Sequence, residues 1–185
     1  SESFDWTILG QQVLMTKLKF PDLTKMLKEE DIPEFLKPYL KFLGLGIPSN
    51  LDAWDGYPAD RNKLYDVMKK ANKSFISLAG DTHNAWVSEL TDAQGDKIGI
   101  ELGTPSVSSP GITDAIKLDK TKFATEIVKM NSELNWMDPE HRGYLVLNFS
   151  NDQMEARFNF ISELQKVDST IASTKIFKVL KNNLE

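Results

Sequence analysis

An aspartate and a histidine two positions apart, Asp81 and His83, follow the mainly apolar run 75–79 and a single glycine, Gly80. A carboxylate and an imidazole released from the carboxyl end of a buried strand can hold a metal ion or a phosphate group above the edge of a sheet. Gly80 allows the tight turn that this placement requires. We therefore expect any catalytic centre of the chain to include Asp81 and His83, as metal ligands or as catalytic groups.

A structural role for the same pair stays open. In that reading Asp81 caps backbone N–H groups of the turn, and His83 forms a hydrogen bond at the strand end. The neighbouring residues favour a site, because Asn84 adds a second polar side chain that can contact a substrate and Trp86 can pack beside it.

Two further segments contain candidate residues for binding a substrate or shaping the site. The loop 48–58 is dense in turn-forming and aromatic residues, and it contains Trp54, Asp55 and Tyr57. These residues also fit a turn that leads into a helix, with the two aromatic rings as core anchors. Arg142 stands just before an expected strand, where its planar guanidinium can either pair with a phosphate or lie in a surface loop.

Other catalytic classes lack their sequence signatures. The loop 104–111 contains several serines, but the chain has no Gly-x-Ser-x-Gly nucleophile elbow and only two histidines, which disfavours serine catalysis. Neither the Gly-x-x-x-x-Gly-Lys-Ser/Thr loop nor the Gly-x-Gly-x-x-Gly loop occurs, so we expect no nucleotide site of those kinds.

The expected elements follow the order of a mixed α/β chain. A strand is expected at 6–9, a helix begins near Asp60, and a buried strand follows at 74–79. Two hairpins are expected, joining 87–90 to 98–102 and 144–149 to 154–160. Apolar spacing predicts two short helices between 20 and 45, a helix through Phe123, Ile127, Met130 and Leu134, and a terminal amphipathic helix through Ile171, Ile176, Val179 and Leu180 with Lys175, Lys178 and Lys181 on its polar face. We accordingly divide the chain into a domain at 1–165 and a helix at 166–185.

Composition narrows the class of protein. With 185 residues, 41% hydrophobic and 26% charged, the chain is long enough to bury a core and is neither disordered nor membrane-spanning in type. No apolar stretch approaches the roughly 18 residues of a membrane span. The 22 basic and 27 acidic residues give a net charge of −5, which does not favour nucleic acid as a partner. The absence of cysteine excludes disulfides and thiolate metal ligands.

Four segments, in this order, resemble the C-terminal portion of the PhoD-like alkaline phosphatases, a branch of the metallophosphoesterases. They are WTILGQQVLM at 6–15, NLDAWDGYPADR at 50–61, LAGDTHNAW at 78–86 and ELGTPSVSSPG at 101–111. The resemblance extends over about residues 6–160, and it includes no motif in 17–47 or after about 165.

The resemblance implies a fold, an activity and a set of site residues. The fold is the C-terminal half of a metallophosphoesterase-like α/β/β/α two-sheet sandwich with mixed sheets, to which the terminal helix is added. The implied activity is hydrolysis of phosphomonoesters or phosphodiesters at a metal cluster, with calcium and iron as the metals of the best-known members, in a periplasmic or secreted enzyme. Asp81 and His83 match the late metal-site motif, and Trp54, Asp55 and Tyr57 match a signature that shapes the site.

The chain departs from the family pattern at its start. The earlier ligand motifs, of the Asp-x-His, Gly-Asp-x-x-Asp and Gly-Asn-His types, do not occur before Trp6, and His83 and His141 are the only histidines. We expect this chain to lack a complete two-metal centre and to need the N-terminal half of the same enzyme as its partner. The alternative hypothesis is a non-catalytic binding module, in which the loops around Trp54 and Trp86 and the expected helix after Ser169 dock a partner.

Overall fold

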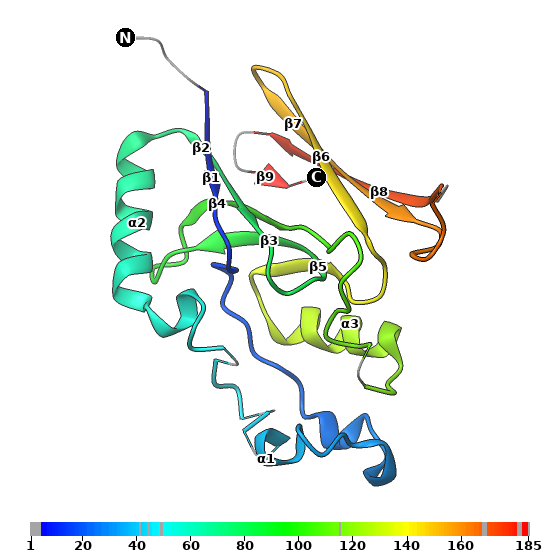
Figure 1. Cartoon of the computed structure of the whole chain (residues 1–185). Coiled ribbons are helices and arrows are strands. Elements are labelled where there is room, and N and C mark those ends of the chain that lie inside the picture. Colours follow the sequence, from blue (N-terminus) through cyan, green and yellow to red (C-terminus); the bar gives the residue numbers. More distant parts are fainter. Residues whose placement is uncertain are drawn as a thin grey trace.

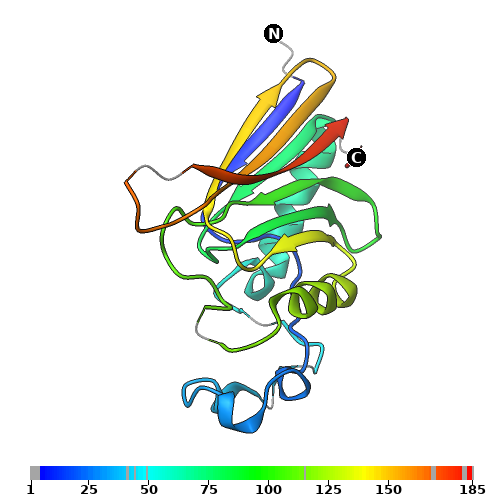
Figure 2. The same cartoon turned by 90° about the vertical axis from the view of Figure 1, so that its right-hand side faces the viewer.

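Two β-sheets lie face to face in the computed structural model, and helices cover the outer face of the larger sheet (Figures 1 and 2). The structure describes residues 5–40, 42–43, 45–48, 50–114, 116–167, 170–180 and 183–184. The larger sheet has five strands in the order β1-β2-β4-β3-β5, and the smaller sheet has four in the order β6-β7-β8-β9. The expectation of a mixed α/β chain with two sheets is confirmed.

The predicted strands and hairpins are present, with slightly wider bounds in most cases. The larger sheet consists of β1 (Trp6–Gly10), β2 (Ser74–Ala79), β3 (Ala85–Thr91), β4 (Lys97–Gly103) and β5 (Leu134–Asp138). The smaller sheet consists of β6 (Gly143–Phe149), β7 (Gln153–Ile161), β8 (Ile171–Leu180) and β9 (Asn183–Leu184). The helices are α1 (Lys37–Leu40), α2 (Pro58–Ala71) and α3 (Lys120–Met130), with 3-10 turns at Leu23–Lys25, Glu29–Asp31 and Trp54–Gly56. None of the described helices has the length and apolar character needed to cross a bilayer.

The direction of the strands brings the candidate loops to one edge of the larger sheet. β1, β2 and β4 run parallel, so the segments that follow them leave the sheet at the same edge. β3 and β5 are antiparallel, and Ala85 at the start of β3 pairs with Asp138 at the end of β5. This edge therefore gathers the segments 11–20, 80–84, 104–114 and 139–142.

Two apolar layers hold this arrangement together. Between the sheets, Val87 and Leu102 of the larger sheet pack with Phe158 and Val179 of the smaller one, all fully buried. On the opposite face of the larger sheet, α2 and α3 supply Tyr65, Phe123 and Ile127 as their buried residues. The site edge thus projects from a sheet that is packed on both faces.

Side chains, rather than a neighbouring strand, bind the extended segment after β1. The backbone N–H groups of 15 and 16 donate to Glu101, whose carboxylate oxygens lie 2.8–3.0 Å away. The next three N–H groups, at 17, 18 and 19, donate to Glu133, Asp55 and Asn131. Glu101 is fully buried, and its loss of solvation raises its pKa, while the N–H and hydroxyl groups that donate to it oppose that rise.

The predicted terminal helix is wrong. Residues 171–180 form β8, which pairs antiparallel along β7. The apolar spacing at 171, 176, 179 and 180 suggested a helix, but the segment is rich in β-branched residues, which favour strands. In the strand, Val179 is fully buried and Phe177 is partly buried against the same inter-sheet core, whereas Ile176 is 43% exposed. The lysines Lys175 and Lys178 are exposed, as expected, and Lys181 lies outside the described residues.

Two smaller expectations also fail. The helix through Phe123 ends at Met130, and Leu134 begins β5 instead of a further helical turn. The helix ends here because the side-chain amide of Asn131 donates to the carbonyl oxygens of residues 127 and 19. The outer helical layer on the smaller sheet, implied by an α/β/β/α sandwich, is not found among the described residues.

Candidate functional site

The turn that contains Asp81 and His83 is locally strained. Both residues have left-handed backbones, with φ of 61° and 59°. Non-glycine residues held in this region cost roughly 1–3 kcal/mol each, and they persist only where the surroundings determine the conformation. Here the Gly80 N–H donates to the carbonyl of residue 12 at 2.9 Å, and the Trp86 indole N–H donates to the Thr82 hydroxyl at 2.7 Å. The strain is therefore held by contacts on both sides of the turn.

One hydrogen bond fixes the chemical state of the His83 ring. Its Nδ1 lies 2.8 Å from the carbonyl oxygen of Pro110. A carbonyl oxygen only accepts, so Nδ1 must carry the proton and Nε2 of the neutral ring keeps its lone pair. Within the described part of the chain, neither Nε2 of His83 nor the exposed Asp81 carboxylate has a hydrogen-bond partner. Both groups are free to bind an added cation or substrate.

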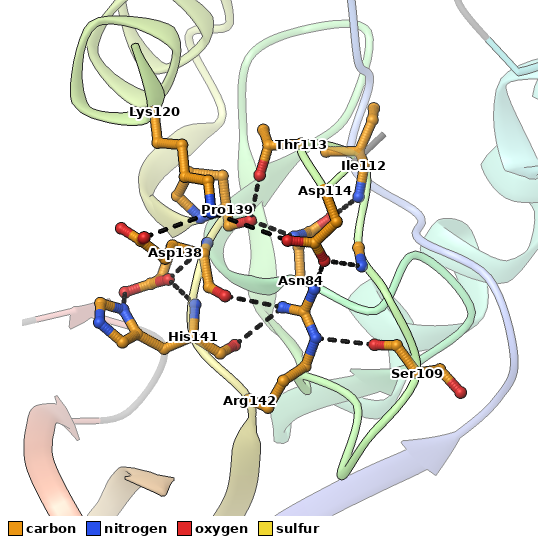
Figure 3. Close-up of polar contacts among 12 residues, drawn as sticks. Asn84, Ser109, Ile112, Thr113, Asp114, Lys120, Asp138, Pro139, His141 and Arg142 are labelled. Carbon is orange, nitrogen blue, oxygen red and sulfur yellow. Dashed lines mark hydrogen bonds and ion pairs between the residues drawn. The ribbon is translucent and has the colours of Figure 1, made fainter. Parts of the chain in front are cut away.

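Asn84 joins three segments of the edge, as Figure 3 shows. Its side chain is fully buried, and its amide group donates to the carbonyl of Pro139 at 3.0 Å and accepts from the N–H of Ile112 at 3.2 Å. The Thr113 hydroxyl donates to the same Pro139 carbonyl at 2.6 Å. Asn84 thus holds the loop that follows β4, and this position fits a site-shaping role.

Arg142 is enclosed by the same loop and is only 4% exposed (Figure 3). Its Nε donates to the carbonyl of Ser109 at 2.7 Å, its Nη1 donates to the carbonyls of residues 140 and 141, and its Nη2 pairs with the Asp114 carboxylate. Burial lowers the pKa of Arg142. Because every guanidinium nitrogen is occupied, the structure favours site shaping by Arg142 over contact with a phosphate.

Two residues of the loop 48–58 hold the segment that follows β1. The Trp54 indole N–H donates to the Gln11 side chain at 2.8 Å. Asp55 accepts from the N–H of Leu18 at 3.0 Å and pairs with Arg61 at 2.9 Å, and both members of that pair are nearly buried. Tyr57 stands apart from these contacts, since its side chain is 54% exposed just before α2.

A cavity of about 570 Å³ is lined by residues of the loop 48–58, the turn 80–84 and the loop after β4. Its polar lining includes Asp55, Asp81 and Asn84, while most of its wall is apolar. The apolar residues come from the segment after β1, the turns around 20–43 and the start of α3, among them Leu14, Leu18, Phe20, Leu23, Phe35 and Phe123. Its volume is within the range of small-molecule sites.

Sequence reasoning missed three residues that organise this edge. Asp114 and Pro110 are far from Arg142 and His83 in sequence, so no local pattern could have paired them. Glu101 did leave a signal, because it is the one charged residue within the stretch 98–103 of β4. A charge in that position indicates a buried acceptor with dedicated donors.

The described residues fit part of a metal centre. No group of three or more histidine, aspartate or glutamate side chains in the described ranges could hold a metal ion. His141, the other histidine, is engaged with Asp138 at 2.8 Å. The free Nε2 of His83 and the nearby Asp81 carboxylate have the chemistry of ligands, and further donors are needed to complete a site.

Comparison with known proteins found relatives by sequence and by fold. A family model described as PhoD-like phosphatase matches residues 1–158. Alkaline phosphatase D from Bacillus subtilis (strain 168) is 26% identical over 181 residues, which cover 94% of this chain and 27% of that protein. A solved structure described as "Structure of PhoD" superposes with a TM-score of 0.69 at 21% identity, covering 98% of this chain and 31% of that one. The chain therefore spans about a quarter to a third of these relatives and shares their fold.

Proposed function

Because the chain belongs to the PhoD-like phosphatase family, we propose that it is the C-terminal part of a metal-dependent hydrolase of phosphomonoesters or phosphodiesters. The observation that carries the proposal is the His83 ring, which is held by the Pro110 carbonyl and presents a free Nε2. An imidazole whose Nδ1–H is bound by a backbone carbonyl is the usual form of a metal-binding histidine.

The roles of the residues follow from their contacts. A bound cation in such a site polarises the phosphoryl group and lowers the pKa of bound water. In this proposal His83 ligates through Nε2, and Asp81 either ligates directly or orients a neighbouring group with its carboxylate. Asn84 and Arg142 keep the loop after β4 in place, and Trp54 and Asp55 support the segment after β1. Tyr57 is left as a candidate contact for the substrate.

The remaining ligands are assigned to the portion of the enzyme that this chain does not contain. This assignment is supported by the lack of a complete ligand cluster in the described residues and by the 27% share of the relative's length. Calcium with iron is the metal set implied by the family resemblance, and a periplasmic or secreted location is proposed on the same ground. Alone, the chain is expected to show negligible turnover.

The test is a substitution in an intact enzyme that contains this chain. His83→Ala removes one ligand, so turnover should fall by more than the roughly 10- to 100-fold loss that is typical of residues behind the ligands. His141→Ala is the matched control, since its imidazole is bound to Asp138 and is expected to change turnover less than about threefold. A His83→Ala enzyme that keeps its activity would exclude His83 as a ligand.

The alternative, a non-catalytic binding module, is supported by a separate observation. The cavity wall is largely apolar and includes Phe35, which is 60% exposed, and Tyr39 and Leu45, later in the same segment of the chain, are 61% and 65% exposed. Such side chains are typical of surfaces that meet a partner. The two functions are separated by the His83→Ala experiment, because a binding module has no turnover to lose.

A further inference from the structure

The position of the Pro110 carbonyl, which holds His83, depends on contacts on both sides of that proline. Ser109, the preceding residue, accepts from Nε of Arg142 at 2.7 Å. Gly111, the following residue, donates its N–H to Asp114 at 2.6 Å, and Asp114 is itself paired with Arg142. The pair of Arg142 and Asp114 therefore binds the residue on each side of Pro110, Arg142 at Ser109 and Asp114 at Gly111.

The loop also packs against this ion pair without spare room. A Cβ placed on Gly111 would lie 2.5 Å from Nδ2 of Asn84 and 3.0 Å from Nη2 of Arg142. A larger residue here therefore requires a shift of the loop or of the Asn84 and Arg142 side chains. The backbone beside Pro110 is thus closely packed against Asn84 and Arg142.

The ion pair is stabilised by its surroundings. Arg142 is almost fully buried, and the Asp114 carboxylate that balances it is also 3.7 Å from the ammonium group of Lys120. Lys120 in turn pairs with Glu140, one of the residues whose carbonyl accepts from Arg142 (Figure 3). A planar guanidinium can bind these separate acceptors together, whereas a lysine ammonium offers no such fork.

We propose that Arg142 and Asp114 are a positioning pair, which fixes the tautomer and orientation of His83 by holding the Pro110 carbonyl against Nδ1. This proposal rests on the proposed function for its catalytic meaning, because the tautomer it selects is the one that leaves Nε2 available to a cation. Neither residue touches the substrate. Their effect passes entirely through the loop and the histidine ring.

The test is nuclear magnetic resonance of the isotopically labelled 185-residue chain in alkaline buffer, where imidazole is neutral. Long-range proton–nitrogen couplings report which ring nitrogen carries the proton. In the unmodified chain, His83 should be protonated at Nδ1. Arg142→Lys and Gly111→Ala should each increase the Nε2-protonated fraction of His83, while Arg157→Lys, which alters a surface pair with Glu155, should not.

His141 serves as an internal reference in the same spectra, because its ring is bound to the carboxylate of Asp138 and should keep its tautomer. If Arg142→Lys does not fold, Asp114→Ala decides the question, since the Asp114 side chain is 31% exposed whereas that of Arg142 is 4% exposed. The proposal is overturned if His83 is protonated at Nε2 in the unmodified chain, or if folded variants at Arg142, Asp114 or Gly111 leave its tautomer unchanged.

A second measurement separates this proposal from the proposed function. In the intact enzyme, Asp114→Ala should weaken metal retention by about 10- to 100-fold, as is typical when a ligand loses its support. If the tautomer of His83 shifts but His83→Ala leaves the turnover of the intact enzyme unchanged, the proposed function fails and the positioning pair stands. If His83→Ala abolishes turnover while Asp114→Ala changes neither tautomer nor metal retention, the positioning pair fails alone.

Discussion

Glu101 is the residue whose removal should most damage the framework of the site. Its carboxylate accepts from the N–H groups of Met15 and Thr16, from the Thr16 hydroxyl and from the Ser77 hydroxyl, at 2.7–3.0 Å. Glu101→Ala leaves two buried N–H groups without an acceptor, because the hydroxyls can turn to other partners but the backbone cannot. Each unsatisfied buried group costs about 1–3 kcal/mol, so the expected loss is about 2–6 kcal/mol in the free energy of unfolding.

The assay is urea unfolding of the chain, followed by tryptophan fluorescence, with the free energy taken from the midpoint and slope. A loss of this size is a large part of the roughly 5–15 kcal/mol that stabilises an ordinary domain. Glu89→Ala is the matched control, since Glu89 lies on the adjacent strand and its side chain pairs with the exposed Lys97, and it should cost about 1 kcal/mol or less. If Glu101→Ala costs no more than Glu89→Ala, the account of the segment 15–19 is wrong.

Three other outcomes are expected. Burial raises the pKa of Glu101, so the part of the stability that depends on its protonation is fully present below the ordinary glutamate range and is lost as pH rises through the raised value; Glu101→Gln should remove this pH dependence, as urea midpoints measured across pH will show. Tyr65→Phe should change stability by less than about 1 kcal/mol or increase it, because the Tyr65 hydroxyl is buried and has no hydrogen-bond partner among the described residues; a loss above about 2 kcal/mol in the same assay would contradict this. Deleting residues 170–184 should unfold the smaller sheet instead of opening access to the site, since Val179 is part of the inter-sheet core; a deletion variant with unchanged thermal unfolding would contradict this.

The parts of the fold that were predictable from sequence are those with local signals. The strand at 74–79 is marked by its apolar run and by Gly80, and both hairpins by turn-forming residues between alternating patterns. The prediction for the tail failed because the apolar residues at 176, 179 and 180 have the spacing of a helix face, whereas the pairing with β7 that makes the segment a strand leaves no local signal. Leu134 was placed in a helix for the same reason.

The residues of the candidate site also differ in whether a local sequence pattern predicts them. Asp81 and His83 were predicted as site residues because they adjoin a buried strand and share one short segment. The pair of Arg142 and Asp114 was not found, because the two residues are 28 positions apart and meet only through the sheet edge. Contacts that depend on tertiary packing leave no trace in a local pattern, so the supports of a site are harder to predict than its exposed groups.

The central claim is that His83 is a metal ligand in a PhoD-like phosphatase, and metal content tests it most directly. An intact enzyme that contains this chain and its His83→Ala variant should be purified in parallel, dialysed, and analysed for calcium, iron and other metals by mass spectrometry. We expect the variant to fold and to retain less metal per chain than the unmodified enzyme. Equal metal content in the two proteins would contradict the account.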